Sequence, residues 1–421
     1  MTADRADDAA PGLPSGRKAL VGSGVLLALA VALANAMNAV FQFALARILG
    51  PADYALLAAL FAVVLVGAVP PLAFQATTAR EVASRLATGE VATAAAVLRG
   101  TLRAILAWTV VLFVLSIALV LVGAALGLEH PLAVGATAAT VAIALAIPVV
   151  WGGLQGTGRF RELSGAHLCF AGTRLAAGVA IGLAGGGVAA IMLGVAAATA
   201  LTVVVTTLPL RGLLRLADPV ALPARRLATL PNAGAAVALT ALAALTTSDL
   251  VVAKLAFPAD EAGDYAAASV GARVLLLLPI AVTTVLFPRV ATLRDPVRER
   301  RHLGAGLAAV AAVSTVAVTV LWVFAGPLIE LAFGPKYAEA EAWLGPLSLA
   351  MALYALATVY LYHFLSLGRS RFAVWLVALL AAQLVAYGLL HASPSELIGV
   401  QIAAASLTLV ACELWHLLRH R

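Results

Sequence analysis

Residues 104–126 read AILAWTVVLFVLSIALVLVGAAL and contain no charged side chain. A helix needs about 20 mainly apolar residues to cross the hydrocarbon core of a bilayer. A membrane-spanning β-strand would instead alternate polar and apolar residues over about 10 positions. Similar apolar runs recur along the chain, and only helices or closed barrels satisfy their own backbone groups within lipid. The stretch therefore predicts one transmembrane helix among many.

The composition of the chain leads to the same class. Of its 421 residues, 63% are hydrophobic and 11% are charged, and the mean hydropathy is +1.04. A soluble domain carries about 25% charged residues, so this chain has too few charges to coat a water-facing surface. We expect an all-α integral membrane protein with about 12 helices, at 20–46, 54–78, 101–126, 132–156, 163–186, 188–213, 231–256, 265–291, 304–332, 341–366, 372–391 and 395–418.

The cysteines and the polar N-terminus give no sign of a metal or a cofactor. Cys169 and Cys412 lie inside apolar segments, without metal-ligand spacing and without a disulfide framework. Residues 1–18 are polar, and we expect them to form a disordered cytoplasmic segment. The apolar run that follows could also be a cleaved signal peptide. We expect it to stay in the protein as the first helix, because it continues to about residue 46.

Lysines and arginines are concentrated in every second joint between the expected helices. Short cytoplasmic loops of membrane proteins are enriched in these residues, so we expect both termini on the cytoplasmic side of the cytoplasmic membrane. The opposite joints carry only Arg47, Lys254 and Lys336. The formal net charge of +7 therefore reflects topology, and we expect no nucleic-acid partner. The basic residues of the predicted cytoplasmic joints are Arg80, Arg85, Arg99, Arg103, Arg159, Arg161, Arg211, Arg215, Arg225, Arg226, Arg289, Arg294, Arg298, Arg300, Arg301, Arg369 and Arg371.

The chain contains an internal repeat with an offset of about 210 residues. Residues 46–54, ARILGPADY, correspond to residues 253–260, AKLAFPAD, and GRF at 158–160 corresponds to GRSRF at 368–372. Each copy would hold six helices, so both copies would start from the same side of the membrane. We expect two parallel six-helix bundles, 19–214 and 231–418, a cytoplasmic linker at 215–230 and a cytoplasmic tail at 419–421. Two such halves suit transport by alternating access.

Other classes of membrane protein would need features that the sequence does not show. A channel would more often be a small oligomeric unit. A primary pump would need a nucleotide-binding Gly-x-x-x-x-Gly-Lys-Ser/Thr motif, which is absent from the sequence. A membrane glycosyltransferase would need a large extracytoplasmic loop with paired acidic residues. We therefore expect a transporter rather than an enzyme, although a non-transporting membrane scaffold stays open.

Several stretches, in this order and spacing, resemble one family over residues 20–420. They are 45–54 (LARILGPADY), 156–160 (GTGRF), 248–254 (SDLVVAK), 262–269 (AGDYAAAS) and 333–337 (FGPKY). Together they resemble the polysaccharide-export branch of the multidrug/oligosaccharidyl-lipid/polysaccharide (MOP) exporter superfamily, which includes the O-antigen (Wzx-type) flippases. Residues 273–288 also resemble the matching helix of lipid II flippases.

The resemblance implies twelve or fourteen helices in two MATE-like bundles, and this chain fits the twelve-helix form. It also implies an isoprenoid-(di)phosphate-linked oligosaccharide or polysaccharide precursor as substrate. Glycan polymerases or glycosyltransferases are the partners that such a substrate implies, beside membrane lipids. By the same resemblance, Arg273 falls at a position where lipid II flippases use a cavity arginine.

Four basic residues are candidates for binding the phosphate of such a substrate. An ionisable group within hydrocarbon costs a few kcal/mol or more, so it needs a reason to be there. Arg174 is expected near mid-membrane and Arg273 about 8 residues into its helix, whereas Arg47 and Lys254 lie near helix ends at matching places of the repeat. Arginine binds phosphate bidentately and lysine binds it as a point charge. Arg47 and Lys254 could instead extend to the interface, and the two buried arginines could pair with a carboxylate.

Asp249 is the carboxylate that lies well inside an apolar segment. It could couple transport to a proton or sodium gradient, or it could be the charge partner of Lys254 or Arg273. Asn35, Asn38 and Gln42 share one face of the first helix, because they are spaced by three and four residues. That face could contact sugar in a cavity, or it could hydrogen-bond to another helix.

Two transport hypotheses follow. The first is a flippase for an isoprenoid-linked glycan, and the second is a cation-coupled drug or small-molecule antiporter of the same superfamily. The intramembrane arginines Arg174 and Arg273 outnumber the carboxylate Asp249, which favours an anionic substrate.

Overall fold

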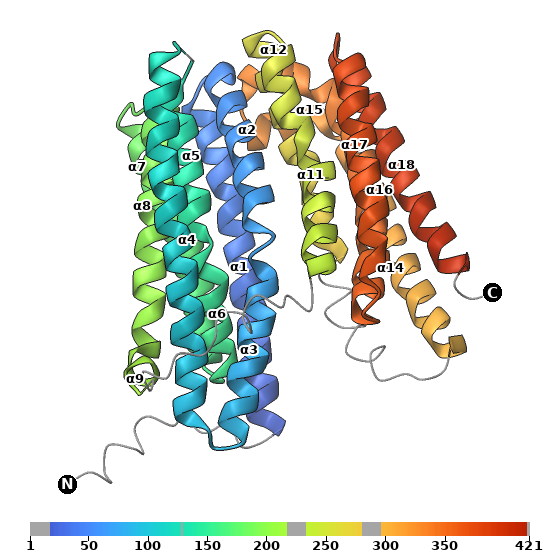
Figure 1. The fold of residues 1–421 in the computed structure, drawn as a ribbon. Coiled ribbons are helices and arrows are strands. Elements are labelled where there is room, and N and C mark those ends of the chain that lie inside the picture. Colours follow the sequence, from blue (N-terminus) through green and yellow to red (C-terminus); the bar gives the residue numbers. More distant parts are fainter. Residues whose placement is uncertain (1–16, 128, 217–232, 280–295, 419–421) are drawn as a thin grey trace. The chain divides into compact units, whose positions relative to one another are not determined.

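The structure is a computed structural model that describes residues 17–127, 129–216, 233–279 and 296–418 (Figure 1). All secondary structure within these residues is helical. Two compact units are formed, one by Met1–Leu45 with Pro70–Pro231 and the other by Ala46–Val69 with Asn232–Arg421.

Eleven helical segments of the described residues are long and apolar enough to cross a membrane. They correspond to eleven of the twelve expected helices, which confirms an all-α, multi-pass membrane protein. The remaining expected helix, 265–291, begins as α12 (Ala259–Ala272) and a 3₁₀ turn, η2 (Arg273–Leu277), before it leaves the described residues. The expected linker 215–230 falls almost wholly outside those residues, and so do the expected tail and most of the N-terminal segment.

The first unit is an assembly of long helices around small residues. Gly152 and Gly156 allow α6 to lie directly against α3, since a Cβ atom at either position would come within 2.7 Å of a backbone oxygen of α3. Small residues commonly permit such close packing of membrane helices. The elements of this unit are most of α1 (Arg17–Ile48), α3 (Leu72–Ala87), α4 (Val91–Ala125), α5 (Pro131–Ala144), α6 (Ala146–Gly156), α7 (Phe160–Leu183), α8 (Val188–Thr207), η1 (Leu208–Leu210) and α9 (Arg211–Arg215).

The second unit is built around α16, whose side chains are mostly buried and which packs against α12, α14 and α18. Beside α12 and η2, this unit contains the C-terminal end of α1, α2 (Pro51–Ala68), α11 (Ala233–Ala256), α14 (Pro296–Val323), α15 (Ala325–Ala332), η3 (Pro335–Ala340), α16 (Glu341–Ser366), η4 (Ser370–Phe372), α17 (Ala373–Leu389) and α18 (Pro394–Leu418).

One expected helix is divided between the two units. The range 54–78 breaks at Pro70 and Pro71, which separate α2 from α3 because proline removes a backbone donor and clashes with the preceding turn. α3 packs on α6 and α4, whereas α2 packs on α11 and α12. The contact between α2 and α12 is close, since a Cβ atom on Gly263 would lie 2.4 Å from the Pro51 side chain. The compact units therefore differ from the expected bundles in the placement of α2.

Candidate functional site

The buried carboxylate Asp249 lies on α11 and is fully shielded from solvent. Its Oδ1 atom accepts a hydrogen bond from Nη2 of Arg273 at 2.6 Å. Its Oδ2 atom accepts one from the Ser269 hydroxyl at 2.6 Å and one from the Tyr265 hydroxyl at 3.3 Å. All three donors come from α12 and its junction with η2, so the packing of α12 on α11 assembles the site.

Arg273 is anchored by two kinds of acceptor. In addition to Asp249, the carbonyl oxygen of Thr246 accepts hydrogen bonds from Nε at 3.1 Å and from Nη2 at 2.9 Å. The side chain is 14% exposed. Its Nη1 atom is buried and has no hydrogen-bond partner among the described residues. A guanidinium carries five N–H donors, of which three bind Thr246 and Asp249, so both N–H groups of Nη1 stay available for a further acceptor.

The pair of Asp249 and Arg273 is electrically balanced, and this is what makes it tolerable inside the unit. Removing one partner of a buried ion pair leaves an uncompensated charge and typically costs about 3–5 kcal/mol. The ion pair is one of the two roles that the sequence left open for Asp249. Lys254, the other partner considered there, makes no ion pair or hydrogen bond with any described residue.

A second polar network, from α16, α17 and α18, binds the backbone carbonyl of Leu245 on α11. The oxygen of Leu245 accepts hydrogen bonds at 3.0 Å from the side-chain amides of both Gln383 on α17 and Gln401 on α18. The Gln383 amide also donates to Gln401 at 2.8 Å, and Tyr354 donates to the Gln383 side-chain oxygen at 3.1 Å. Both glutamines are almost completely buried. Neither was predicted from the sequence, although a glutamine inside an apolar segment is the signal that could have found them.

Arg174 lies in the first unit, on α7. Its guanidinium carbon is 5.1 Å from the ring centroid of Phe41 on α1 and 5.4 Å from that of Phe170 on its own helix. Gly178 makes room for this arrangement, since a Cβ atom there would lie 2.5 Å from the Phe41 ring. The aromatic faces attract the cation and so help to hold a charged side chain within an apolar unit.

Arg47 and Lys254 have different environments, despite their matching places in the repeat. The Arg47 side chain donates to the carbonyl oxygens of Ala332 at 3.2 Å, Glu330 at 3.1 Å and Leu331. These are carbonyls at the C-terminal end of α15, where a cation also interacts favourably with the helix dipole. Lys254 is half-buried at the C-terminal end of α11.

The polar face of α1 carries acceptors that no described residue satisfies. The Oδ1 atom of Asn38 and the Oε1 atom of Gln42 are buried without a hydrogen-bond partner in the described part of the chain. Asn35 on the same face is half-buried. Among the residues singled out from sequence, the structure therefore brings Asp249 and Arg273 together, while Arg174 and this polar face belong to the first unit.

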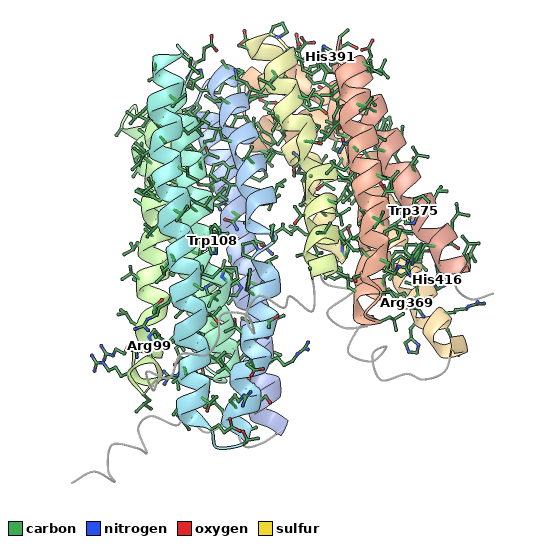
Figure 2. All side chains as sticks on the ribbon, in the orientation of Figure 1. Arg99, Trp108, Arg369, Trp375, His391 and His416 are labelled. Atoms are coloured by element: carbon green, nitrogen blue, oxygen red, sulfur yellow. The ribbon has the colours of Figure 1, made fainter. Side chains whose placement is uncertain are left out.

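The ends of the second unit carry different side chains. Figure 2 shows Arg369 and His416 towards one end and His391 towards the other. Arg369 lies in the joint between α16 and α17, and His391 follows the C-terminal end of α17. The positive-inside rule assigns the Arg369 end to the cytoplasm, and this orientation stays a prediction.

Comparison with solved structures defines the class of fold. No protein-family model and no curated protein sequence matches the chain. Its fold is nevertheless similar to that of solved transporters, among them MATE family transporters described as members of the MOP superfamily.

Three solved structures illustrate this similarity. An inward-facing multidrug resistance MATE family transporter matches with a TM-score of 0.69 and 17% identity, covering 91% of this chain and 93% of its own. The lipid II flippase MurJ, in an inward closed conformation, matches with a TM-score of 0.71 and 11% identity, covering 92% and 86%. A MOP superfamily transporter from Pyrococcus furiosus, described as having a binding pocket of reverse polarity, matches with a TM-score of 0.58 and 13% identity, covering 94% and 95%.

Proposed function

We propose that this chain is a flippase that moves an isoprenoid-(di)phosphate-linked oligosaccharide or polysaccharide precursor across the cytoplasmic membrane by alternating access. In this proposal Arg273 contacts the phosphate of the substrate and Asp249 couples transport to a proton or sodium gradient. The transporter fold and the multi-pass helices support the proposal, and MurJ, which shares this fold, is a lipid II flippase.

The observation that carries the proposal is the incomplete coordination of Arg273. Asp249 and the Thr246 carbonyl engage Nε and Nη2, while the buried Nη1 has no partner among the described residues. A phosphate oxygen is the acceptor that a guanidinium binds most strongly, and two parallel N–H···O bonds fix its orientation. In this proposal, the opening of the cavity during alternating access exposes Nη1, and the substrate phosphate binds there and competes with Asp249 for Nη2.

The same geometry suggests how coupling would work. While Asp249 is ionised, it neutralises Arg273 and weakens the attraction for an anion. Protonation of Asp249, or binding of Na⁺ to it, removes that competition and leaves the full charge of Arg273 to the substrate phosphate. Loss of the proton or sodium ion restores the ion pair and releases the substrate. A bound organic cofactor has no part in this cycle.

The other candidate residues are assigned by their surroundings. Arg174, which lies near two aromatic rings, is proposed as a second contact for the substrate anion. Asn35, Asn38 and Gln42 are proposed to contact sugar hydroxyls, since two of them carry buried acceptors without described partners. Lys254, near the end of α11, stays a proposed contact for the substrate phosphate. Arg47 is proposed to have a structural role instead, because its Nε and Nη2 atoms bind three backbone carbonyls at the C-terminal end of α15.

The decisive experiment measures translocation of a fluorescent polyprenyl-diphosphate-linked glycan in proteoliposomes. Arg273→Ala and Asp249→Asn alone would each leave a buried group without its partner, so the double variant is the essential one. We expect the double variant to fold and to translocate at less than a tenth of the wild-type rate. Wild-type translocation by the folded double variant would refute the assigned roles of both residues.

A second candidate function is cation-coupled antiport of a drug or small molecule. The observation in its favour is that Asp249 already neutralises Arg273, so the pair presents little net charge to a substrate. The MATE family transporter that shares the fold is a multidrug resistance protein. Transport of a cationic dye that depends on a proton or sodium gradient, without any glycan translocation, would favour this alternative.

A further inference from the structure

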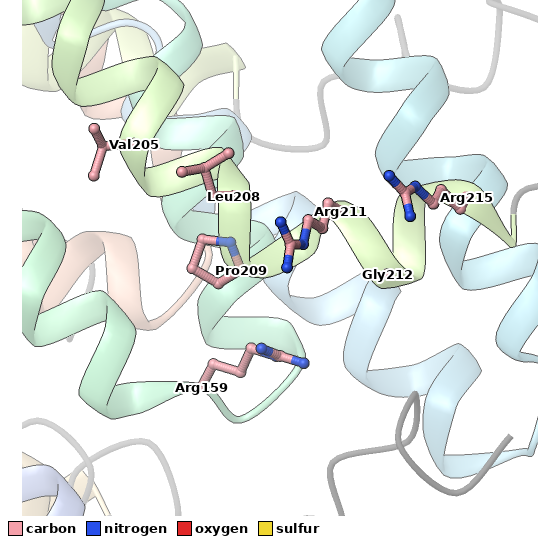
Figure 3. A pocket seen from close by; sticks show the side chains of 7 residues that line it. All are labelled: Arg159, Val205, Leu208, Pro209, Arg211, Gly212 and Arg215. Carbon is pink, nitrogen blue, oxygen red and sulfur yellow. The ribbon is translucent and has the colours of Figure 1, made fainter. Parts of the chain in front are cut away.

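A pocket with three arginines lies at the end of α8, in the first unit. It has a volume of about 650 Å³ and is lined by Arg159, Val205, Leu208, Pro209, Arg211, Gly212 and Arg215. Figure 3 shows two of the arginines on α9 and the third at the joint before α7. None of these residues belongs to the site around Asp249, which lies in the other unit.

The local sequence explains how the arginines come to surround one space. Pro209 follows α8 and lies in the 3₁₀ turn η1, after which the chain continues as the short helix α9. Leu210 and Leu213 are buried in the core of the unit, together with Leu98 and Leu154. Arg211 and Arg215 are exposed on the same turn of chain. The buried leucines thus anchor α9 and hold its arginines at the rim of the pocket.

The pocket carries an excess of positive charge. Arg159 forms an ion pair with Glu162, with Nη1 and Oε1 separated by 3.6 Å. Within the described part of the chain, neither Arg211 nor Arg215 forms an ion pair with a carboxylate. An anion could therefore bind both arginines without displacing a carboxylate from either.

The remainder of the lining is apolar and continues along α8. Leu201, Val205 and Leu208 are spaced by four and three residues, so they share one helix face. They are 51%, 40% and 52% exposed, respectively. In a membrane-spanning helix, such exposed apolar side chains contact lipid acyl chains. A hydrocarbon chain lying on this face would end at the arginines.

We propose that this pocket binds the headgroup phosphate of an anionic phospholipid, whose acyl chain lies along the exposed face of α8. The binding site pairs a negatively charged head with two arginines and a hydrophobic tail with a hydrophobic stripe. Basic pockets among membrane helices on the cytoplasmic side are suited to anionic headgroups, and the predicted topology places Arg159, Arg211 and Arg215 on that side. The site is separate from the site of the transported substrate. Its occupancy would depend on the amount of anionic lipid in the surrounding leaflet.

The test compares matched double variants of the full-length protein in nanodiscs of zwitterionic lipid. Arg211→Gln/Arg215→Gln removes two charges from the pocket, whereas Arg80→Gln/Arg103→Gln removes two exposed charges from α3 and α4 in the same unit. The probe is short-chain phosphatidylglycerol. We expect the pocket variant to bind it about 30-fold more weakly, the combined effect of two basic residues near an anionic lipid, and the control to change less than about threefold. Equal weakening in both variants would show unspecific surface attraction and would overturn the proposal.

Two further measurements distinguish an anionic phospholipid from a soluble phosphate and from a polyprenyl phosphate. Leu208→Asn should weaken phosphatidylglycerol binding while leaving the weak binding of inorganic phosphate unchanged, because it alters the apolar part of the pocket alone. If inorganic phosphate bound as tightly as the lipid, the occupant would be a soluble anion and the proposal would be wrong. If a polyprenyl phosphate bound more tightly than phosphatidylglycerol, the pocket would belong to the substrate path instead.

Discussion

Arg47 and Lys336 each bind the main chain of the other's segment. The Arg47 side chain donates to the last carbonyls of α15, and Lys336, in the turn that follows α15, donates to the carbonyl oxygen of Arg47 at 2.9 Å. The Tyr337 hydroxyl donates to the carbonyl of Ala46 at 2.8 Å. The C-terminal end of α1 is thereby fixed to η3 within the second unit.

This reciprocal contact predicts a structural role for Arg47. Replacement by alanine should lower the free energy of unfolding by about 1–2 kcal/mol, because charged hydrogen bonds at a helix C-terminus are lost. Lys254→Ala, at the matching place in the repeat, should change it by less than about 0.5 kcal/mol. Thermal unfolding in detergent, followed by tryptophan fluorescence, measures both, and equal effects would contradict the assignment.

The ion pair of Asp249 and Arg273 predicts strong coupling between two substitutions. Arg273→Ala alone should destabilise the protein by about 3–5 kcal/mol, since it leaves a buried carboxylate without its charge partner. Adding Asp249→Asn should restore most of that loss, because the remaining amide is neutral and can still bind the Ser269 and Tyr265 hydroxyls. A double-mutant cycle on unfolding free energy checks this prediction. Additive effects would mean that the two side chains do not interact.

The contact between Gly178 and Phe41 predicts that α7 tolerates no larger residue there. In Gly178→Ala the new methyl group would meet the Phe41 ring at 2.5 Å, so the ring must move and its contact with Arg174 changes. We expect a loss of about 1–3 kcal/mol from overpacking. Gly165→Ala is the matched control on the same helix, because nothing lies within 4 Å of its Cβ position. That control should be neutral or stabilising by up to about 1 kcal/mol.

Asp264 predicts a pH dependence of stability. It lies near the start of α12, ahead of the expected span 265–291, and its side chain is almost completely buried. Burial first, then the negative charge of Glu339, raises the pKa of Asp264 to about 6, although a backbone hydrogen bond from Ala340 opposes the rise. Folding therefore favours the protonated carboxyl group over the ionised one.

The sign of the effect follows from the raised pKa. Below pH 3.8, the ordinary pKa, the group is protonated in both folded and unfolded states and carries no penalty. Between pH 3.8 and about 6 the unfolded chain loses this proton while the folded protein keeps it, so stability falls, by at most about 3 kcal/mol. Above pH 6 the group is ionised in both states and the stability levels off. Asp264→Asn should remove this decline and stabilise the protein at pH 7. The check is to compare unfolding of the two proteins from pH 4 to 8, and parallel curves would refute it.

The transmembrane helices could be predicted from sequence because hydropathy is a local property. The run at 104–126 lies within α4, and eleven of the twelve expected segments contain a helix of sufficient length. The positions at which helices break were harder to predict from the sequence. Pro70 and Pro71 lie inside one expected helix, 54–78, but the structure separates α2 from α3 there. Whether a proline bends or ends a helix depends on the neighbours that satisfy the freed backbone groups.

For the candidate site, the sequence could predict individual residues but not which of them contact one another. Asp249 and Arg273 were conspicuous as charges in apolar segments, and pairing between them was one of two interpretations that the sequence allowed. Gln383 and Gln401 were missed, because an uncharged amide in a membrane segment is a weaker signal than a charge. The role of Arg47 could not be predicted from its own helix, since its acceptors lie 283 to 285 residues away in the sequence.

The sequence by itself determined that the chain is helical and multi-pass, because apolar runs must be buried in lipid and must satisfy their own backbone hydrogen bonds. It also determined which residues are costly to bury, and thus where a site could be. Only the tertiary structure decided that Arg273 meets Asp249, that α2 belongs with the second unit and that Arg47 caps α15. The physical reason is that a buried charge requires a partner wherever it lies, whereas packing between distant helices decides which partner it meets.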